Sequence, residues 1–322
     1  MKTNKIAVII PCFKVSKFIL NVIKNIDKKI DKIYIIDDLC PENSGNLVLK
    51  KCKDKRVKVI FNKKNLGVGG AMITGYRQAI IDKMNIAVKI DGDGQMDPRL
   101  IDNFINPILE GKADYTKGNR FFNLAFLKKM PKVRLIGNAL LSFITKISSG
   151  YWDIMDPTNG YTAIHVNLLK ILPLEKIDNR YFFESDMLFR LNTIKACVLD
   201  IPMIAKYEDE KSNLKISKII LEFPFKHLNR FFKRLFYNYL LRDFNIGSLN
   251  LISGICLLLF GVSFGLYHWY KNYPLAKFTP TGTIMFSALS IILGFQMILF
   301  FINYDIMSTP KTVLSKNLFA NK

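Results

Sequence analysis

The chain has only five cysteines, and their spacing does not suit a cysteine-based scaffold. They stand at positions 12, 40, 52, 197 and 256, an odd number without a Cys-x-x-Cys pair. Disulfide frameworks need paired cysteines and zinc sites favour short ligand spacings, so we expect neither. The first apolar run, Ile6–Ile10, is also too short for a signal peptide. We therefore expect reduced cysteines that mostly pack in the interior of a cytosolic domain.

The glycine fingerprint of dinucleotide-binding proteins is missing as well. The turn after the first apolar run reads Pro11-Cys-Phe-Lys-Val-Ser, without the G-x-G-x-x-G pattern. Glycines come later, in Asn65-Leu-Gly-Val-Gly-Gly, but no Gly-Lys-Ser/Thr ending follows them. These absences argue against a nucleotide-cofactor oxidoreductase and against a P-loop. We interpret the later glycines as a tight turn that lets the following helix pack closely.

Acidic residues are in the minority, and the excess of positive charge favours anionic partners. Lysine and arginine number 47 against 26 aspartates and glutamates, which gives a net charge of +21. Nucleic acid and anionic lipid both suit such a charge. The lysines are scattered along the chain, however, and a nucleic-acid binder has no need of the two apolar runs described below. We therefore expect a lipid bilayer as a partner and no nucleic acid.

Short β-rich segments alternate with amphipathic helical stretches in the first hundred residues. This alternation predicts βαβ units and a mainly parallel α/β sheet flanked by helices. Ligands of such sheets collect at the carboxyl ends of the strands. The predicted strand ends carry Pro11, Asp37-Asp38, Asn62 and Asp91-Gly-Asp93.

Polar side chains at these strand ends suit a divalent cation and a nucleotide. Oxygen ligands from Asp91, Asp93 and Gln95 suit Mg²⁺ or Mn²⁺, which bind one or two carboxylates together with phosphates and water. The alternative is a pair of ordinary Asp-Gly turns. The carboxylates of Asp37 and Asp38 could accept hydrogen bonds from a ribose or a base, or else cap the next helix.

The last hundred residues differ in composition from the rest of the chain. Apolar residues recur at helical spacing from Leu221 to Tyr239 with cations between them, which predicts a basic amphipathic helix in a lipid headgroup layer. Two runs without Asp, Glu, Lys or Arg follow, Ser248–Tyr270 and Thr281–Phe301. Each is near the roughly 20 residues that a membrane-spanning helix needs. The alternative is a buried helical hairpin in a soluble protein.

These patterns predict four segments. We expect a catalytic domain at residues 1–214, interfacial helices at 215–246, two transmembrane helices at 247–303 and a tail at 304–322. Cations are frequent before the first apolar run and sparse between the two runs, so the positive-inside rule predicts a cytoplasmic catalytic domain and tail. The expected location is the plasma (inner) membrane, crossed twice.

Taken in order, the motifs resemble glycosyltransferase family 2 with the GT-A fold. The likeness is strongest to polyprenyl-phosphate sugar synthases of the dolichol-phosphate mannose synthase and GtrB types. It covers residues 5 to 205 and rests on Val8-Ile-Ile-Pro11, Ile36-Asp37-Asp38, Asn65-Leu-Gly67, Asp91-Gly-Asp93-Gly-Gln95, Lys117-Gly-Asn-Arg120 and Asp156-Pro-Thr-Asn-Gly160-Tyr161.

The resemblance implies roles for individual residues. Pro11, Asp37, Asp38 and Asp91 would bind the nucleotide sugar, and Asp91, Asp93 and Gln95 would hold the metal. Arg120 and Arg134 would bind the acceptor phosphate, with Asp156 shaping the acceptor side. Asp91, Asp93 and Asp156 would thus be the catalytic set. Glu184 and Asp186 stand on an expected helix as a possible base or as a charge pair at the helix start.

The resulting hypothesis is an inverting transfer of a hexosyl group from a UDP- or GDP-sugar to undecaprenyl or dolichyl phosphate for cell-envelope glycan synthesis. One alternative acceptor is a hydroxyl of a lipid-linked saccharide, which would require a general base such as Asp156, Glu184 or Asp186. A processive polysaccharide synthase is disfavoured because no Gln-x-x-Arg-Trp motif is present. A non-catalytic membrane adaptor is the alternative outside the enzymes. The sequence leaves open whether the two spans drive homo-oligomerisation, carry the acceptor or only anchor the domain.

Overall fold

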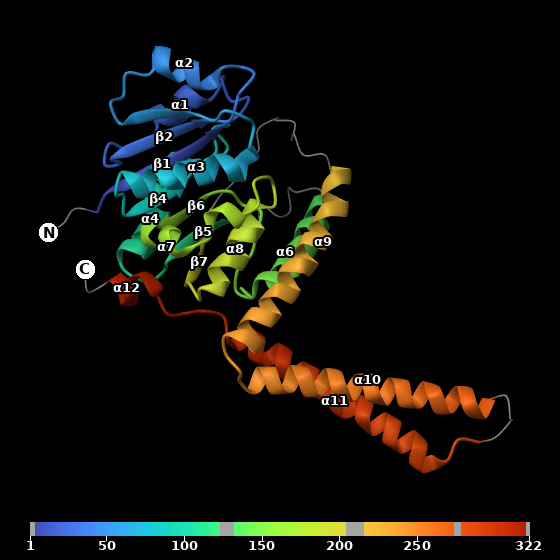
Figure 1. The fold of residues 1–322 in the computed structure, drawn as a ribbon. Coiled ribbons are helices and arrows are strands. Elements are labelled where there is room, and N and C mark those ends of the chain that lie inside the picture. The colour runs from blue at the N-terminus through green and yellow to red at the C-terminus, as the bar shows by residue number, and fades with distance from the viewer. Residues whose placement is uncertain (1–3, 123–131, 204–215, 274–277, 320–322) are drawn as a thin grey trace. The chain divides into compact units, whose positions relative to one another are not determined.

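The structure, a computed structural model, describes residues 4–122, 132–203, 216–273 and 278–319 (Figure 1). The chain forms two compact units. The first unit comprises Met1–Phe231 and Pro310–Lys322, and the hairpin unit comprises Phe232–Thr309. The boundary predicted after residue 214 lies outside the described residues.

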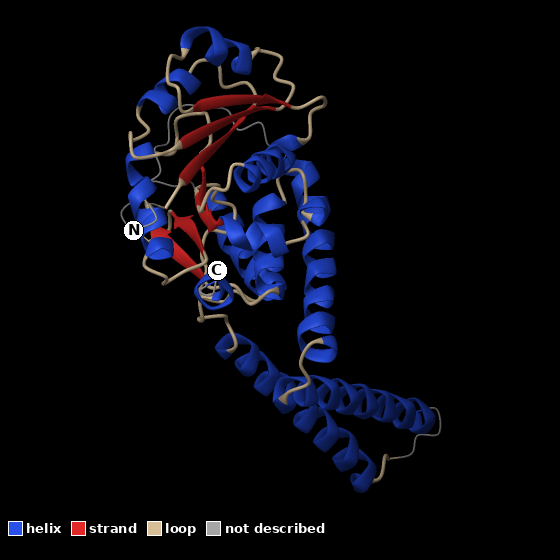
Figure 2. Ribbon diagram, turned by 60° about the vertical axis from the view of Figure 1, so that its left-hand side comes forward, coloured by secondary structure: helices blue, strands red, loops and turns tan. Residues whose placement is uncertain are grey.

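A seven-stranded sheet forms the centre of the first unit (Figure 2). Its order is β3-β2-β1-β4-β6-β5-β7. Strand β6 runs antiparallel to β4 and β5, and the other neighbouring pairs are parallel, so the predicted mainly parallel sheet is confirmed. The strands are β1 (Ile6–Cys12), β2 (Lys32–Asp37), β3 (Val57–Phe61), β4 (Ile86–Lys89), β5 (Tyr115–Asn119), β6 (Thr162–His165) and β7 (Val198–Pro202).

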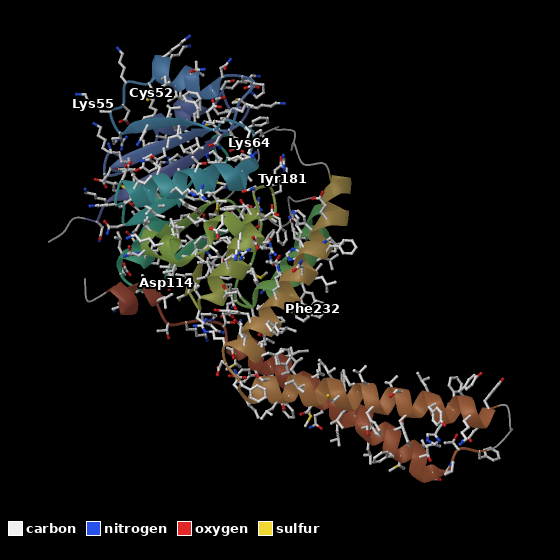
Figure 3. The ribbon with its side chains drawn as sticks, in the orientation of Figure 1. Cys52, Lys55, Lys64, Asp114, Tyr181 and Phe232 are labelled. Atoms are coloured by element: carbon white, nitrogen blue, oxygen red, sulfur yellow. The ribbon has the colours of Figure 1, made fainter. Side chains whose placement is uncertain are left out.

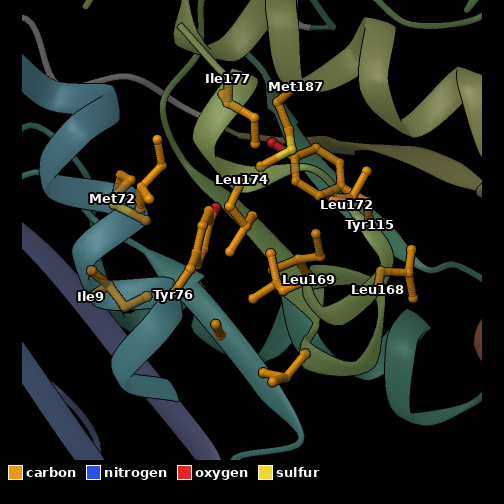
Figure 4. Close-up of a cluster of buried hydrophobic side chains, with 14 of the residues drawn as sticks. Ile9, Met72, Tyr76, Tyr115, Leu168, Leu169, Leu172, Leu174, Ile177 and Met187 are labelled. Carbon is orange, nitrogen blue, oxygen red and sulfur yellow. The ribbon is translucent and has the colours of Figure 1, made fainter. Parts of the chain in front are cut away.

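Helices cover both faces of the sheet because its central strands are apolar on both sides. In β1, Ala7 and Ile9 pack into one core, and Val8 and Ile10 pack into the other. The first core contains residues of α3, α7 and α8 (Figure 4), and the second contains residues of α1, α2 and α4. The helices of this unit are α1 (Ile19–Lys24), α2 (Ser44–Lys51), α3 (Gly67–Ile81), α4 (Ile101–Leu109), α6 (Lys132–Ser149), α7 (Val166–Ile171), α8 (Phe183–Thr193), most of α9 (Ile216–Leu235) and α12 (Leu314–Phe319), with 3₁₀ turns η1 (Pro98–Leu100) and η2 (Leu174–Lys176).

The glycines at the start of α3 form the predicted tight turn. Gly67 has φ +83°, a conformation that L side chains rarely adopt. The Gly70 N–H donates to the Asn179 carbonyl at 3.0 Å, and a Cβ on Gly69 would collide with the backbone at Asp178. The close approach of α3 to the segment before α8 therefore depends on these glycines.

Helix α9 is attached to the first unit by one of its faces. The ring of His227 lies 4.8 Å from that of Phe182, and its Nδ1 is 2.8 Å from Ser148 Oγ on α6. Lys226 and Arg230 form ion pairs with Asp178 and Asp186, at 2.7 and 2.5 Å. Phe225 and Leu228 are 74% and 52% exposed. The helix is amphipathic as predicted, but two of its cations are used within the protein.

The hairpin unit contains two helices that are long and apolar enough to cross a membrane, α10 (Ile246–Asn272) and α11 (Thr281–Met307), preceded by a π-helical turn, Phe236–Leu241. In the most apolar 18 residues of each helix, only 11% (α10) and 17% (α11) are buried. The core helix of a soluble protein is mostly buried. The two helices approach closely at small residues. A Cβ on Gly294 would lie 2.9 Å from the Gly254 carbonyl oxygen, and Ser287 Oγ donates to the Gly261 carbonyl at 2.7 Å.

An ion pair closes the hairpin unit beyond the predicted apolar run. Helix α11 continues past Phe301 to include Asp305, which is 4% exposed. Its carboxylate accepts from Arg234 Nη1 at 2.6 Å and from the Tyr239 hydroxyl at 2.6 Å. A buried carboxylate of this kind needs such partners.

After the hairpin, the chain returns to the first unit. The carboxylate of Asp114, which is fully buried, accepts the backbone N–H groups of Leu314 and Ser315, each at 2.7 Å (Figure 3). It also accepts the N–H of Cys197 at 2.9 Å. One carboxylate therefore joins the C-terminal segment to the loop before β7.

The buried imidazole of His227 makes the stability of the first unit depend on pH. Burial lowers the pKa of His227 from 6.5 to about 4. The unfolded chain therefore binds a proton that the folded chain excludes, and this contribution to stability is lost as pH falls from about 6.5 towards 4. The loss can reach about 3 kcal/mol. We expect His227→Gln to lose less stability than the unaltered chain over this range, measured by thermal unfolding followed through Trp152 fluorescence with both proteins carrying Trp269→Phe. Parallel losses in both proteins would contradict this role of His227.

Candidate active site

The predicted site residues meet at the carboxyl edge of the parallel strands. Cys12 of β1 is in register with Asp37 of β2, and Ile9 of β1 is in register with Lys89 of β4. Pro11 lies within β1 opposite Ile36. The start of the antiparallel strand β6 reaches the same edge, because Thr162 pairs with Lys89. The segment before β6 thus lies beside the segment after β4.

Asp37 and Asp38 are buried, each 3% exposed, and both hold the local backbone. Asp37 accepts the N–H of Cys40 and of Gly45, both at 2.7 Å, and so fixes the entry to α2. Asp38 accepts the N–H of Gly67 at 2.7 Å at the start of α3. Asp37 therefore caps the next helix, as the alternative had it, whereas Asp38 binds the start of α3, and the contact of either with a nucleotide stays a prediction.

Asp91 is fixed by a buried lysine. Lys89 is 1% exposed, and its Nζ lies 2.7 Å from Asp91 Oδ1 and 3.4 Å from Glu184 Oε1. Burial alone would lower the pKa of Lys89, but Asp91 and Glu184 outweigh it and raise that pKa. A Cβ on Gly160 would overlap Lys89 Nζ and lie 2.9 Å from Asp91 Oδ2. Position 160 therefore has no room for a side chain beside this ion pair.

Asp93 and Gln95 form the turn that follows Asp91. Gly94 has φ +84°, and Asp93 Oδ1 accepts the Gln95 N–H at 3.0 Å. Asp91, Asp93 and Gln95 are all partly exposed. Among the described residues no three His, Cys, Asp or Glu side chains form a metal-binding group. Binding of a divalent cation by Asp91 and Asp93, with phosphate and water as further ligands, stays a prediction.

Arg120 and Asp156, both predicted on the acceptor side, form an ion pair. Arg120 Nε and Nη2 donate to the two carboxylate oxygens of Asp156 at 2.6 and 2.7 Å. Asp156 is fully buried and has φ +50°. A bidentate pair of this kind fixes the guanidinium plane. Arg134 lies in the first turn of α6, and its side chain is outside the described part of the structure.

Glu184 and Asp186, at the start of α8, have different partners. Glu184 faces Lys89, as described above. Asp186 is fully buried, accepts the Asp178 N–H at 2.9 Å and pairs with Arg230 of α9 at 2.5 Å. The arrangement of Asp186 is that of a structural ion pair, whereas Glu184 belongs to the sheet edge.

A second buried lysine lies in the same row of the sheet. Lys117 of β5 pairs with Thr162 of β6, opposite Lys89, and its Nζ donates to the Asn159 carbonyl. Burial lowers the pKa of Lys117 to about 8, and it raises the pKa of Asp200, its neighbour in β7, to about 7. Asp200 also accepts the Met155 N–H at 2.8 Å, next to Asp156.

Sequence reasoning missed Lys89 as a site residue. Its signal was present, because a lysine inside the apolar run Ile86-Ala-Val-Lys-Ile90 has to be buried with the strand. A buried ammonium needs a carboxylate partner, and Asp91 stands two residues further along the chain.

Known proteins show the same sequence pattern and fold. Residues 7–172 match glycosyl transferase family 2. The chain is 31% identical over 223 residues to the UDP-N-acetylglucosamine–dolichyl-phosphate N-acetylglucosaminyltransferase of Methanococcus voltae, covering 65% of this chain and 88% of the relative. It is 26% identical to the undecaprenyl-phosphate mannosyltransferase of Micrococcus luteus, covering 58% and 75%.

Solved structures share the architecture at low identity. The glucosyl-3-phosphoglycerate synthase of Mycobacterium tuberculosis, solved with Mn²⁺, UDP and phosphoglyceric acid, superposes with a TM-score of 0.52 at 14% identity. The match covers 72% of this chain and 78% of the synthase, and at this identity it shows the GT-A fold alone. With a family match over more than half of its length, the chain belongs to glycosyl transferase family 2 and is a glycosyltransferase similar to the polyprenyl-phosphate members of that family.

Proposed function

We propose that this glycosyltransferase moves a hexosyl group, with inversion, from a nucleoside-diphosphate sugar to a polyprenyl phosphate. The observation that carries the proposal is the pair of partly exposed carboxylates, Asp91 and Asp93, at the carboxyl edge of the sheet. Ligands of open α/β sheets bind at this edge. The names of the M. voltae and M. luteus relatives support a dolichyl or undecaprenyl phosphate acceptor.

On the donor side, Asp91, Asp93 and Gln95 would hold Mg²⁺ or Mn²⁺ against the diphosphate. The metal would supply positive charge to stabilise the leaving diphosphate. Pro11, Asp37 and Asp38 would border the nucleotide, where Asp37 already orders the turn after β2 and Asp38 the turn between β3 and α3. The M. tuberculosis synthase, which has the same fold, was solved with Mn²⁺ and UDP, in line with the general use of a divalent metal proposed here.

On the acceptor side, Arg120 and Arg134 would bind the lipid phosphate. A phosphate monoester is largely ionised near neutral pH, since its second pKa is about 6, so it needs to be oriented rather than deprotonated. Asp156 holds the plane of Arg120 for this purpose. An acceptor hydroxyl would instead need a base. Asp156, Glu184 and Asp186 each pair with a cation in the interior, which favours the phosphate acceptor.

The membrane arrangement follows from α10 and α11. We propose that both helices span the plasma (inner) membrane and that the first unit lies on the cytoplasmic face, where nucleotide sugars are available. The exposed apolar surfaces of the two helices and the cation-rich segment before α10 support this arrangement.

The proposal is tested by transfer assays on the full chain in lipid nanodiscs. Polyprenyl phosphate, Mg²⁺ or Mn²⁺ and individually radiolabelled UDP- and GDP-sugars should yield a labelled lipid. Mild acid should release the labelled sugar from this lipid. Mass analysis of this lipid would identify the sugar. The absence of lipid-linked label with every common donor would contradict the proposed function.

The metal-binding role predicts the effect of Asp93→Ala. Transfer should fall by at least about 100-fold, because the loss of a metal-holding carboxylate removes the positive charge that would stabilise the leaving diphosphate. The unfolding temperature should stay near that of the unaltered chain, since Asp93 lies on a partly exposed turn. Asp102→Ala, which removes an exposed carboxylate paired with Lys29, serves as the control. Full activity of Asp93→Ala, or transfer in EDTA at the normal rate, would exclude this role.

The crowding at Gly160 predicts a second loss of activity. The Cβ of Gly160→Ala would push aside the ends of Lys89 and Asp91, which are flexible enough to move without unfolding the sheet. A displacement of about 1 Å at a reacting centre can cost about 100-fold in rate. We expect that loss in kcat with a nearly unchanged unfolding temperature. Gly282→Ala, where a Cβ meets nothing within 4 Å, should leave kcat unchanged. Equal kcat for Gly160→Ala and the unaltered chain would be the contrary result.

A further inference from the structure

Lys89 occupies a position where a charge is costly. It lies in β4 between two buried apolar residues, with Ile9 of β1 on one side and Thr162 of β6 on the other. Moving an ammonium group from water into such a place costs several kcal/mol unless it is paired. An apolar side chain of similar length would fill the strand without that cost, so packing alone does not account for the lysine.

The partners of Lys89 connect the interior to the site. Asp91 Oδ1 lies 2.7 Å from its Nζ, and the Asp91 side chain is 31% exposed. Glu184 Oε1 lies 3.4 Å away on a side chain that is 10% exposed. The ammonium of Lys89 thus bridges the partly exposed carboxylate of Asp91 and the nearly buried carboxylate of Glu184.

The other buried lysine of the sheet provides a comparison. Lys117 stands in the same row of residues but donates to the backbone carbonyl of Asn159. Its ammonium therefore fixes the loop before β6, whereas Lys89 fixes a carboxylate of the site. Gly160 lies beside the same ion pair, because a Cβ there would overlap Lys89 Nζ and lie 2.9 Å from Asp91 Oδ2.

We propose that Lys89 is a positioning residue that holds Asp91 through Oδ1, with Glu184 as its counter-charge. This inference rests on the proposed function, since Asp91 acts there on the donor and its metal. Lys89 sets the orientation of Asp91 before any ligand arrives, so that Oδ2 is presented at the sheet edge. Glu184 keeps the ammonium in place and does not act as a base.

The test is a set of variants of the full chain, assayed for polyprenyl-phosphate glycosylation. Lys89→Met should lower kcat by about 100-fold, the cost expected for a misplaced reacting group, while the KM for polyprenyl phosphate stays within about twofold. Lys89→Met combined with Asp91→Asn should be no slower than Asp91→Asn alone, because Lys89 acts through Asp91. Lys58→Met removes a half-exposed lysine from the neighbouring region of the sheet and should leave kcat unchanged.

Folding effects are separated by a measurement without ligands. Lys89→Met leaves Glu184 buried without its cation, so the unfolding temperature should drop. Adding Glu184→Gln removes that unpaired charge and should restore the unfolding temperature without restoring kcat. A purely structural role for Lys89 would instead make kcat recover together with the unfolding temperature.

Three further results would overturn the inference. In the first, Lys89→Met retains full kcat while the unaltered chain transfers sugar, which rejects the role of Lys89 alone. In the second, the losses from Lys89→Met and Asp91→Asn multiply in the double variant, so that the lysine acts independently of Asp91. In the third, the unaltered chain transfers no sugar to polyprenyl phosphate from any donor, which rejects the proposed function and this role together.

Discussion

A positive charge buried in the interior of a sheet has to be compensated, and the groups that compensate Lys89 are those that form the functional edge. Asp91 comes from the end of the same strand, and Glu184 from the first turn of α8. The absence of a side chain at Gly160 leaves the space in which the ion pair sits. One ammonium group therefore joins the segment that follows β4 to the start of α8, because an uncompensated charge at this depth would destabilise the fold.

The same constraint recurs around the site. Asp156 is fully buried and takes both donors of the Arg120 fork, and Asp186 is fully buried against Arg230. Each pair joins segments far apart in the chain, Arg120 with Asp156 and Arg230 with Asp186. Arg230 of α9 pairs with Asp186, two residues after Glu184 in α8. The start of α8 thus has contacts both with the sheet edge and with α9.

Much of the architecture could be predicted because it depends on local pattern. The first four strands end within two residues of the predicted strand ends, and the glycines after Asn65 form the expected turn. The apolar runs near the C-terminus became two long helices with largely unburied surfaces. These features can be predicted from the alternation of β-rich and helical segments, from the length of apolar runs and from the conformational freedom of glycine.

The remaining features depend on contacts between distant residues. Strand β5 reads Tyr115-Thr-Lys-Gly-Asn, which has too few apolar residues to mark a buried strand. The pairing of Lys89 with Glu184, and of Asp186 with Arg230, joins residues 95 and 44 positions apart, so no local pattern contains it. Asp37 and Asp38 are predicted to bind a nucleotide, which stays untested, and their oxygens also accept backbone N–H groups, for Asp38 from Gly67, a distant partner that local sequence does not show. Even so, the resemblance to the family located the edge where these groups meet.

The binding of the C-terminal segment by Asp114 has a topological consequence. The polypeptide leaves the first unit after Phe231 and is part of it again from Pro310, where Leu314 and Ser315 donate to the Asp114 carboxylate. If α10 and α11 span a bilayer as proposed, the chain therefore enters and leaves it on the same side, whichever way round the protein inserts. One leaflet then borders an entire folded enzyme, and the other borders only the short connection between Asn272 and Thr281.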